Sequence, residues 1–272
     1  MNPTPPTPQA PQMPATPQTD RATASGERPI RPEPAQRPAA DELRAAAEAA
    51  AGPAATWAIG DREGFLAGSG PADAPVEADG LGPVVALWPV IGTLVAEGAL
   101  SLHTPLTAYC DEATGGATAH HLLTHAADAG SCATLGGIAE HLTGRPLADL
   151  AATRVWHPLG MVRTALTGAG RLHSTVEDLG RFLRHLLAGP DQPLTRAWIT
   201  ESLRIRTGEL TPARGLLWHP APGTDRRQDT WTHHGPGGAD LWVSPLRGRW
   251  ALLVAPCADA PVRGAFRAAA FG

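Results

Sequence analysis

The chain has 272 residues, of which 43% are hydrophobic and 18% charged, and its formal net charge is -4. This composition predicts one globular unit with a sizeable core and a tail. The acidic balance and the lack of basic stripes argue against a nucleic-acid partner. All 22 basic residues other than histidine are arginines, so the chain has no lysine. A guanidinium stays protonated, so none of these side chains can act as the base that a neutral amine provides.

Three cysteines, Cys110, Cys132 and Cys257, have no CxxC spacing. They therefore predict neither a disulfide framework nor a zinc knuckle, and we interpret them as small buried residues in a reducing compartment. No basic segment followed by an apolar run opens the sequence, and no stretch reaches the roughly 18 apolar residues that a membrane-spanning helix needs. We expect a cytoplasmic protein with no membrane partner.

Residues 1–40 consist mainly of Pro, Thr, Gln and Ala and contain almost no large apolar side chain. Such a segment cannot offset the entropy cost of folding, so we expect a disordered or polyproline II arm ahead of a domain at residues 41–272. The PxxP-like repeats leave a second interpretation open, in which the arm binds an aromatic groove and the domain only anchors it. A plain linker is the favoured interpretation.

The first part of the predicted domain has four recognisable elements. Residues 41–51 (DELRAAAEAAA) predict a helix with an acidic start, which suits the helix dipole. Residues 56–59 and 64–67 read as two strands joined by a tight turn. The apolar run at 84–97 is typical of a buried helix, with Pro89 kinking or delimiting its first part.

A helical middle and a strand-rich end follow. Helices are expected around 117–125, 132–143 and 147–155, a capping box from Ser174 to Glu177 opens another, and Thr195 caps a further one. Short apolar segments separated by turns then indicate an antiparallel sheet, at 215–218, 230–233, 240–243 and 250–255, before a last helix at 261–270. Strands at both ends around a helical middle predict an α+β fold in which the two ends share one sheet.

Six segments occur in a family-like order within residues 41–272. They are Leu94–Leu102 (LVAEGALSL), Thr118–His125 (TAHHLLTH), Leu142–Leu147 (LTGRPL), Val155–Met161 (VWHPLGM), Gly170–Phe182 (GRLHSTVEDLGRF) and His233–Pro245 (HHGPGGADLWVSP). Together they resemble the class C β-lactamase-like serine hydrolases of the penicillin-binding-protein superfamily, which includes related esterases and D-Ala-D-Ala peptidases. The resemblance implies a β-lactamase/transpeptidase-like fold with a shortened helical middle.

Active relatives carry Ser-x-x-Lys at the start of the central helix, where the neutral lysine takes the serine proton. Counting back from Gly98 along the family pattern places the serine near Gly80 or Leu81 and the lysine near Pro83 or Val84. Neither residue type is present. The only hydroxyl between Val76 and Gly98 is Thr93, deep in the apolar run.

The other two family motifs are absent or reduced. Tyr109 is the only tyrosine and matches a structural tyrosine of the family rather than its Tyr-x-Asn. The third family motif is Lys-Thr-Gly or His-x-Gly at the edge of the sheet, and it survives here in part as His233-His234-Gly235, with Gly238 following. We therefore predict that His233, Gly235 and Gly238 are the vestigial wall of the site, which could hydrogen-bond a ligand carboxylate or carbonyl. An alternative is that these glycines are retained because the edge strand turns there.

Two further candidates are weaker. His120, His121 and His125 include an i,i+4 pair that can bind zinc, but no nearby Glu or Cys completes such a site, so satisfied helical histidines are favoured. Cys132 could be a thiol nucleophile, although nothing in the sequence fixes a base beside it. We predict no catalytic residue, no cofactor and no metal.

The sequence thus predicts a catalytically inactive β-lactamase-related domain with a ligand-binding or regulatory role toward an unidentified small molecule or protein. Loss of an interdependent nucleophile and base lowers the rate by about 10⁶-fold, and residual oxyanion polarisation supplies about 10³-fold over water. An active esterase or amidase with an unconventional nucleophile near Cys132 or His233 is one alternative. A scaffold that works through its Pro-rich arm is another.

Overall fold

The structure is a computed structural model that describes residues 40–110, 116–126, 128–167, 170–208, 210, 212–222, 230–256 and 258–272, without the side chains of residues 125 and 126. The predicted arm therefore lies outside the described residues, apart from residue 40. Cys257 also lies outside them. None of the helices in the described ranges combines the length and apolarity that crossing a bilayer requires.

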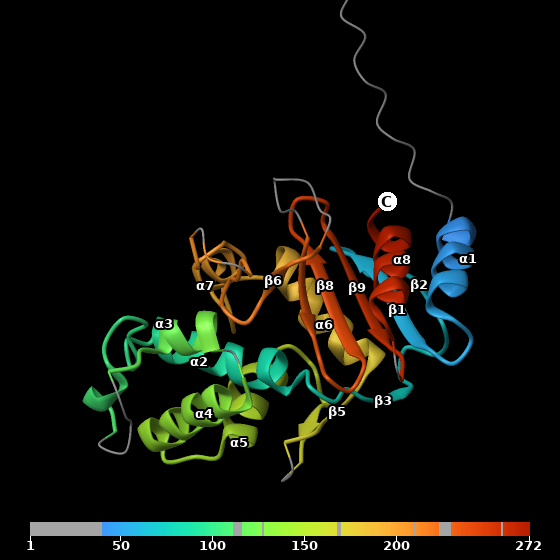
Figure 1. The fold of residues 1–272 in the computed structure, drawn as a ribbon. Coiled ribbons are helices and arrows are strands. Elements are labelled where there is room, and N and C mark those ends of the chain that lie inside the picture. Colours follow the sequence, from blue (N-terminus) through green and yellow to red (C-terminus); the bar gives the residue numbers. More distant parts are fainter. Residues whose placement is uncertain are drawn as a thin grey trace, which may run out of the picture. The chain divides into compact units, whose positions relative to one another are not determined.

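The main sheet has the strand order β2-β1-β9-β8-β7-β6, and each neighbouring pair is antiparallel. The strands are β1 (Thr56–Asp61), β2 (Phe65–Gly68), β6 (His219–Pro220), β7 (Trp231–His234), β8 (Ala239–Ser244) and β9 (Arg249–Val254). β1 pairs with β9 from Thr56 opposite Val254 to Asp61 opposite Arg249. The predicted hairpin and the predicted meeting of the two ends in one sheet are both confirmed (Figure 1).

Alternate residues of the central strands belong to two separate cores, one on each face of the sheet. On one face, α1 (Ala40–Ala51) and α8 (Ala260–Phe271) pack side by side over Trp57 and Trp242, and the Trp57 ring meets Phe266 edge-on at 5.9 Å (Figure 1). On the other face, α6 (Val176–Ala188) and the helical region pack over Leu252 and its neighbours. Each face buries apolar area, the main term that stabilises such layers.

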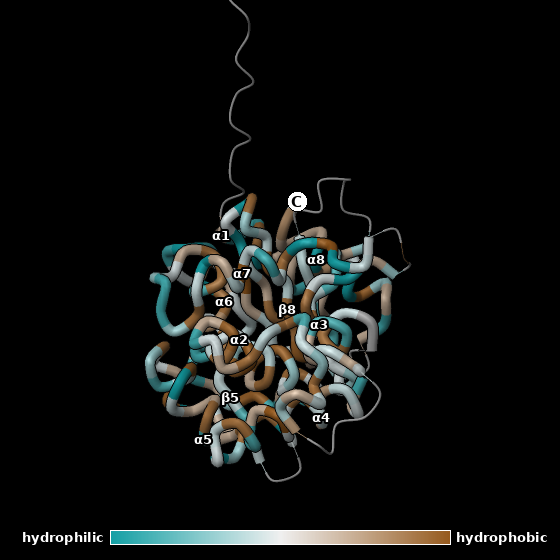
Figure 2. The backbone as a smooth tube through the Cα atoms, turned by 90° about the vertical axis from the view of Figure 1, so that its left-hand side faces the viewer, coloured by the Kyte–Doolittle hydropathy of each residue, from teal (hydrophilic) through white to brown (hydrophobic). Residues whose placement is uncertain are grey.

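The helical region consists of short helices around one buried rod. They are η2 (Leu106–Ala108), α3 (Ala119–His121), η3 (Leu122–Ala126), α4 (Ala129–Thr143), α5 (Leu147–Ala151), η4 (Ala152–Trp156) and α7 (Arg196–Ser202). The rod comprises η1 (Pro83–Leu87), a wide π-type turn, and α2 (Trp88–Ala96). Pro89 lies at the start of α2, so the predicted boundary there is confirmed. In Figure 2 the tube around α2 and β8 is largely brown or white.

Two expectations for the second half of the chain are wrong. Ser174 does not cap α6; Thr175 does, because its side chain accepts a hydrogen bond from the Asp178 amide at 3.1 Å. Ser174 instead lies in β5 (Leu172–Thr175), the middle strand of a small sheet with β3 (Pro75–Glu77) and β4 (Ala165–Leu166) that we did not predict. Its hydroxyl hydrogen-bonds the Thr164 hydroxyl at 2.8 Å.

Residues 215–218 form a turn rather than the expected strand. The amide of Gly215 donates to the Trp218 carbonyl at 2.7 Å, and Leu217 has a φ of 61°. That left-handed conformation is costly for a leucine. Here the Leu217 amide donates to the Leu123 carbonyl at 2.9 Å, and the Leu217 carbonyl oxygen lies 2.9 Å from His233 Nδ1. The turn buries Trp218 completely, with its ring edge-on to Trp88 at 6.1 Å.

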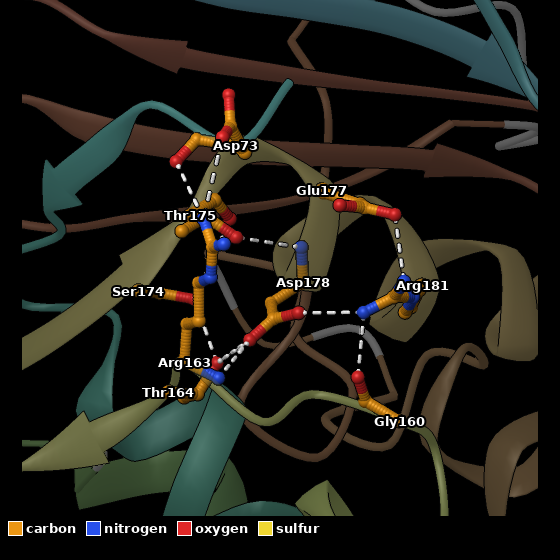
Figure 3. A network of polar contacts seen from close by, with 9 residues as sticks. All are labelled: Asp73, Gly160, Arg163, Thr164, Ser174, Thr175, Glu177, Asp178 and Arg181. Carbon is orange, nitrogen blue, oxygen red and sulfur yellow. Dashed lines mark hydrogen bonds and ion pairs between the residues drawn. The ribbon is translucent and has the colours of Figure 1, made fainter. Parts of the chain in front are cut away.

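A buried carboxylate connects the small sheet to α6 (Figure 3). Asp178, whose side chain is 2% exposed, accepts hydrogen bonds through Oδ2 from the Arg163 amide at 2.8 Å and from the Thr164 hydroxyl at 3.0 Å. Its Oδ1 accepts from Arg181 at 2.9 Å, and Arg181 also donates to the Gly160 carbonyl. A carboxylate buried with this many donors is stabilised only while they remain in place.

We therefore expect Asp178→Ala to lower the free energy of unfolding by about 3 kcal/mol, because it leaves several buried donors without an acceptor. The matched control is Asp73→Ala. Asp73 is 64% exposed and pairs with Arg163 at 3.4 Å, so its removal should cost less than about 1 kcal/mol. Urea unfolding followed by tryptophan fluorescence measures both, and equal losses would contradict the importance of the network.

Candidate functional site

The positions predicted for the family nucleophile and base lie at the start of the buried rod. Leu81 and Val84 are fully buried, and Leu81 begins the first helical turn, since its carbonyl accepts from the Val85 amide at 2.9 Å. Thr93, the one hydroxyl of the run, is buried and donates to the Val90 carbonyl at 2.8 Å within its own helix. No side chain with acid-base or nucleophilic chemistry occupies positions 80–84.

The structure brings His233, from the predicted vestigial wall, next to Gly80. The imidazole Nε2 lies 3.2 Å from the Gly80 carbonyl oxygen, and Nδ1 lies 2.9 Å from the Leu217 carbonyl oxygen. The His233 residue is 8% exposed, and its ring lies edge-on to Trp218 at 6.5 Å. Two segments that are far apart in the sequence therefore meet where the family pattern would place a reacting centre.

Both ring nitrogens of His233 face main-chain carbonyl groups. Burial lowers the pKa of His233 below its ordinary value, and the hydrogen bonds with the Leu217 and Gly80 carbonyls oppose that shift. A neutral imidazole has one N–H and can donate to only one of the two oxygens. Through these two contacts His233 links the sheet edge to the 215–218 turn and to the segment that leads into the rod.

Gly235 and Gly238 form a turn that packs directly on residues 79–80. The Gly235 amide donates to the Ala239 carbonyl at 2.8 Å, and the Gly238 amide donates to the Gly235 carbonyl at 3.1 Å. A Cβ on Gly235 would lie 2.4 Å from the Asp79 carbonyl oxygen. Gly238 has a φ of 84°, a conformation that glycine adopts at little cost.

The contact is equally tight from the other side. Gly80 has a φ of +84°, and a Cβ there would lie 2.3 Å from Pro236 Cδ and 2.6 Å from the Gly235 Cα. These distances are far below van der Waals contact, so a serine at position 80 would have to displace the turn. Atoms of Gly235 and Pro236 thus occupy the space that a Cβ at position 80 would need.

The other predicted candidates do not assemble a second centre. Cys132 is half-buried, and its burial, followed by the charge of Asp128, raises the pKa of its thiol to about 11. The Tyr109 hydroxyl accepts a hydrogen bond from the Ser101 amide at 2.9 Å, which is a structural role. The chain's only asparagine is Asn2, so no Tyr-x-Asn exists; counting asparagines in the sequence would have revealed this directly.

The histidines of the cluster that the structure describes are His120 and His121. His120 stacks against His103 with ring centroids 4.9 Å apart, and the side chain of His125 lies outside the described part of the structure. Within the described residues, no group of three or more His, Cys, Asp or Glu side chains is placed to hold a metal ion.

An antiparallel sheet closed by both ends of the chain, with a buried rod whose start faces the sheet edge, is the architecture that the resemblance to the serine β-lactamase and penicillin-binding-protein class implies. A family model described as beta-lactamase matches residues 87–255, more than half of the sequence. The chain belongs to the β-lactamase family, as its motifs predicted. The match begins after positions 80–84, where the serine and lysine were expected.

Solved structures show the same fold at low sequence identity. A β-lactamase from Mycobacterium bovis is 21% identical, with a TM-score of 0.66 over 80% of this chain and 93% of that chain. An octameric penicillin-binding protein homologue from Pyrococcus abyssi is 15% identical, with a TM-score of 0.64 over 84% and 75% of the two chains. A mutant simvastatin synthase from Aspergillus terreus is 14% identical, with a TM-score of 0.66 over 85% and 92%. No curated protein matches the sequence significantly.

The contact at Gly80 predicts that a family-like serine cannot be accommodated. We expect Gly80→Ser to lower the free energy of unfolding by about 2 kcal/mol through overpacking and an unfavourable φ. The control is Gly137→Ser in α4, where a Cβ would meet no described atom within 4 Å beyond the backbone of its own helix, and it should leave stability unchanged or raised. A Gly80→Ser protein as stable as the control would show that the turn yields easily.

Acid should destabilise this region through the partly buried His219. Burial, followed by the charges of His233, Arg214 and His234, lowers the pKa of His219 from 6.5 to about 4. The unfolded chain therefore takes up a proton first, and the stability contributed by neutral His219 is lost as the pH falls from about 6.5 toward 4, by at most about 1.4 kcal/mol per pH unit.

The measurement is the free energy of unfolding in urea at pH 7.5 and pH 5.0. His219→Gln should reduce the loss of stability between these two pH values, whereas His157→Gln, at an exposed position, should leave the loss unchanged. If the stability of the His219 variant and of the unsubstituted protein depended on pH identically, His219 could not be neutral at pH 5 in the folded protein.

Proposed function

We propose that this chain is a catalytically inactive member of the β-lactamase family that acts in the cytoplasm by binding or regulation. The proposed domain spans residues 41–272, with residues 1–40 as a Pro-rich arm. The observation that carries the proposal is the direct packing of Gly80 on Gly235 and Pro236, where a Cβ would meet Pro236 Cδ at 2.3 Å.

The missing base supports the same proposal. A serine hydroxyl needs a nearby proton acceptor to become a useful nucleophile. With no lysine in the chain, the family's neutral amine cannot be replaced from elsewhere in the fold. Since nucleophile and base act as a unit, their joint absence lowers the rate by about 10⁶-fold.

The alternative of an unconventional nucleophile has little physical support. Cys132 has a thiol whose pKa is raised to about 11, so the reactive thiolate is scarce at neutral pH. His233 holds both ring nitrogens against carbonyl oxygens at 2.9 and 3.2 Å. Among the described residues, Asp128 is a charged group that acts on the Cys132 thiol, and its charge disfavours the thiolate.

The test is acylation of the full chain with a fluorophosphonate and with a penicillin, read out by intact mass, beside an active β-lactamase as positive control. We expect the mass to stay unmodified, and turnover of an activated ester to equal that of a His233→Ala variant. Stoichiometric labelling at any serine or at Cys132, or ester turnover that one substitution abolishes, would refute the proposed inactivity.

A further inference from the structure

A pocket with polar and apolar lining lies between β7, β8 and α8, on the face of the main sheet opposite the one that His233 faces. It is a pocket of about 310 Å³ whose lining includes His234, Trp242, Arg263, Arg267, Pro222 and Gly264. His234 follows His233 on β7, and successive strand residues point to opposite faces. Trp242 belongs to the core under α1 and α8. This pocket is therefore separate from the region around Gly80 and independent of the proposed function.

A fully buried carboxylate organises the polar side of the pocket. Asp240 is 0% exposed and lies directly opposite His234 in the β7–β8 register. Its Oδ1 is 2.7 Å from His234 Nδ1, and its Oδ2 accepts from Arg263 Nε at 2.8 Å. Burying a carboxylate is expensive unless it is paired. Here both oxygens are used to fix the orientation of two side chains at the pocket wall.

The groups that remain available are donors. Among the described residues, no partner is found for the two terminal nitrogens of Arg263, whose side chain is 29% exposed. Arg267 lies four residues further along α8, so both guanidinium groups share one helix face, and Arg267 also donates to the Pro222 carbonyl. Counting the described residues alone, two guanidinium groups and one carboxylate give this pocket a net positive charge.

The rest of the lining is apolar. The Trp242 indole lies edge-on to the His234 ring with centroids 5.9 Å apart, and Pro222 and Gly264 complete that side. The volume is at the small end of ligand pockets, which run from about 300 Å³. A planar carboxylate suits the paired nitrogens of a guanidinium. A single negative charge also matches the net charge of the wall better than a dianion does.

We propose that this pocket binds a small organic carboxylate, with its carboxylate held by Arg263 and Arg267 and its apolar body against Trp242 and Pro222. Asp240 is the positioning residue that holds Arg263 and His234 in place.

The test uses 4-fluorobenzoate as the probe, titrated against the full chain and followed by fluorine NMR. We expect saturable binding that Arg267→Gln weakens at least about tenfold, the effect of losing one charge-assisted hydrogen bond. Arg263→Gln should weaken binding at least as much, but it removes a partner of buried Asp240, so Arg267→Gln is the decisive variant if folding is impaired. Arg204→Gln is the control, because Arg204 is 63% exposed and outside the pocket lining.

Uncharged 4-fluorobenzyl alcohol should bind at least about tenfold more weakly than the acid, because it cannot make charge-assisted bonds. Equal affinity for the acid and the alcohol would overturn the proposal, and so would equal losses in the Arg267 and Arg204 variants. Tighter binding of 4-fluorophenyl phosphate than of 4-fluorobenzoate would overturn the assignment to a carboxylate. Absence of any binding at millimolar probe would overturn the site itself.

Discussion

The contact between residues 79–80 and the turn at Gly235–Gly238 is the constraint that decides what this fold can do. Glycines on both sides allow backbone to pack on backbone, with Gly80 at a φ of +84° and Gly235 against the Asp79 carbonyl. Side chains cannot be added at either position without moving the other. His233 completes the contact, with its Nε2 lying 3.2 Å from the Gly80 carbonyl oxygen. The segments that the family pattern assigns to the site are thus in direct contact, with Gly80 half-buried and Pro236 exposed.

The scaffold around this contact does not depend on catalytic groups. Leu81 and Val84 contribute fully buried apolar surface to the start of the rod, where a serine and a lysine would have to be solvated or paired. The left-handed Leu217 connects the rod's surroundings to the sheet, since its amide donates to the Leu123 carbonyl and its own carbonyl lies 2.9 Å from His233 Nδ1. The Asp178 carboxylate likewise connects α6 to the small sheet, because it accepts hydrogen bonds from the Arg163 amide and the Thr164 hydroxyl (Figure 3).

Much of the fold was predictable because its signals are local. The hairpin at β1 and β2, the rod at 83–96 and the last helix each have a hydrophobic pattern or a turn that identifies them. Ser174 and Thr175 are both good caps, but Ser174 is paired in the small sheet opposite Val76, a partner distant in sequence, and contacts Thr164. Strands as short as β4 and β6 carry no pattern, and the 215–218 turn is set by partners distant in sequence. The packing of the predicted wall residues on Gly80 depends on contacts across more than 150 residues of chain, such as that between His233 and Gly80, and local sequence patterns do not contain such contacts.

The two adjacent histidines of β7 show how a sheet separates chemistry on its two faces. His233 points into the core beside Trp218, where both nitrogens are occupied by carbonyl groups. His234 points to the α8 side, where fully buried Asp240 holds it together with Arg263. Because successive strand residues point to opposite faces, the two adjacent histidines have separate surroundings. A buried carboxylate lowers stability unless it is paired. Apolar packing of this face therefore does not explain why Asp240 lies there between His234 and Arg263. The pocket lined by His234, Arg263 and Arg267 lies on this face of the sheet.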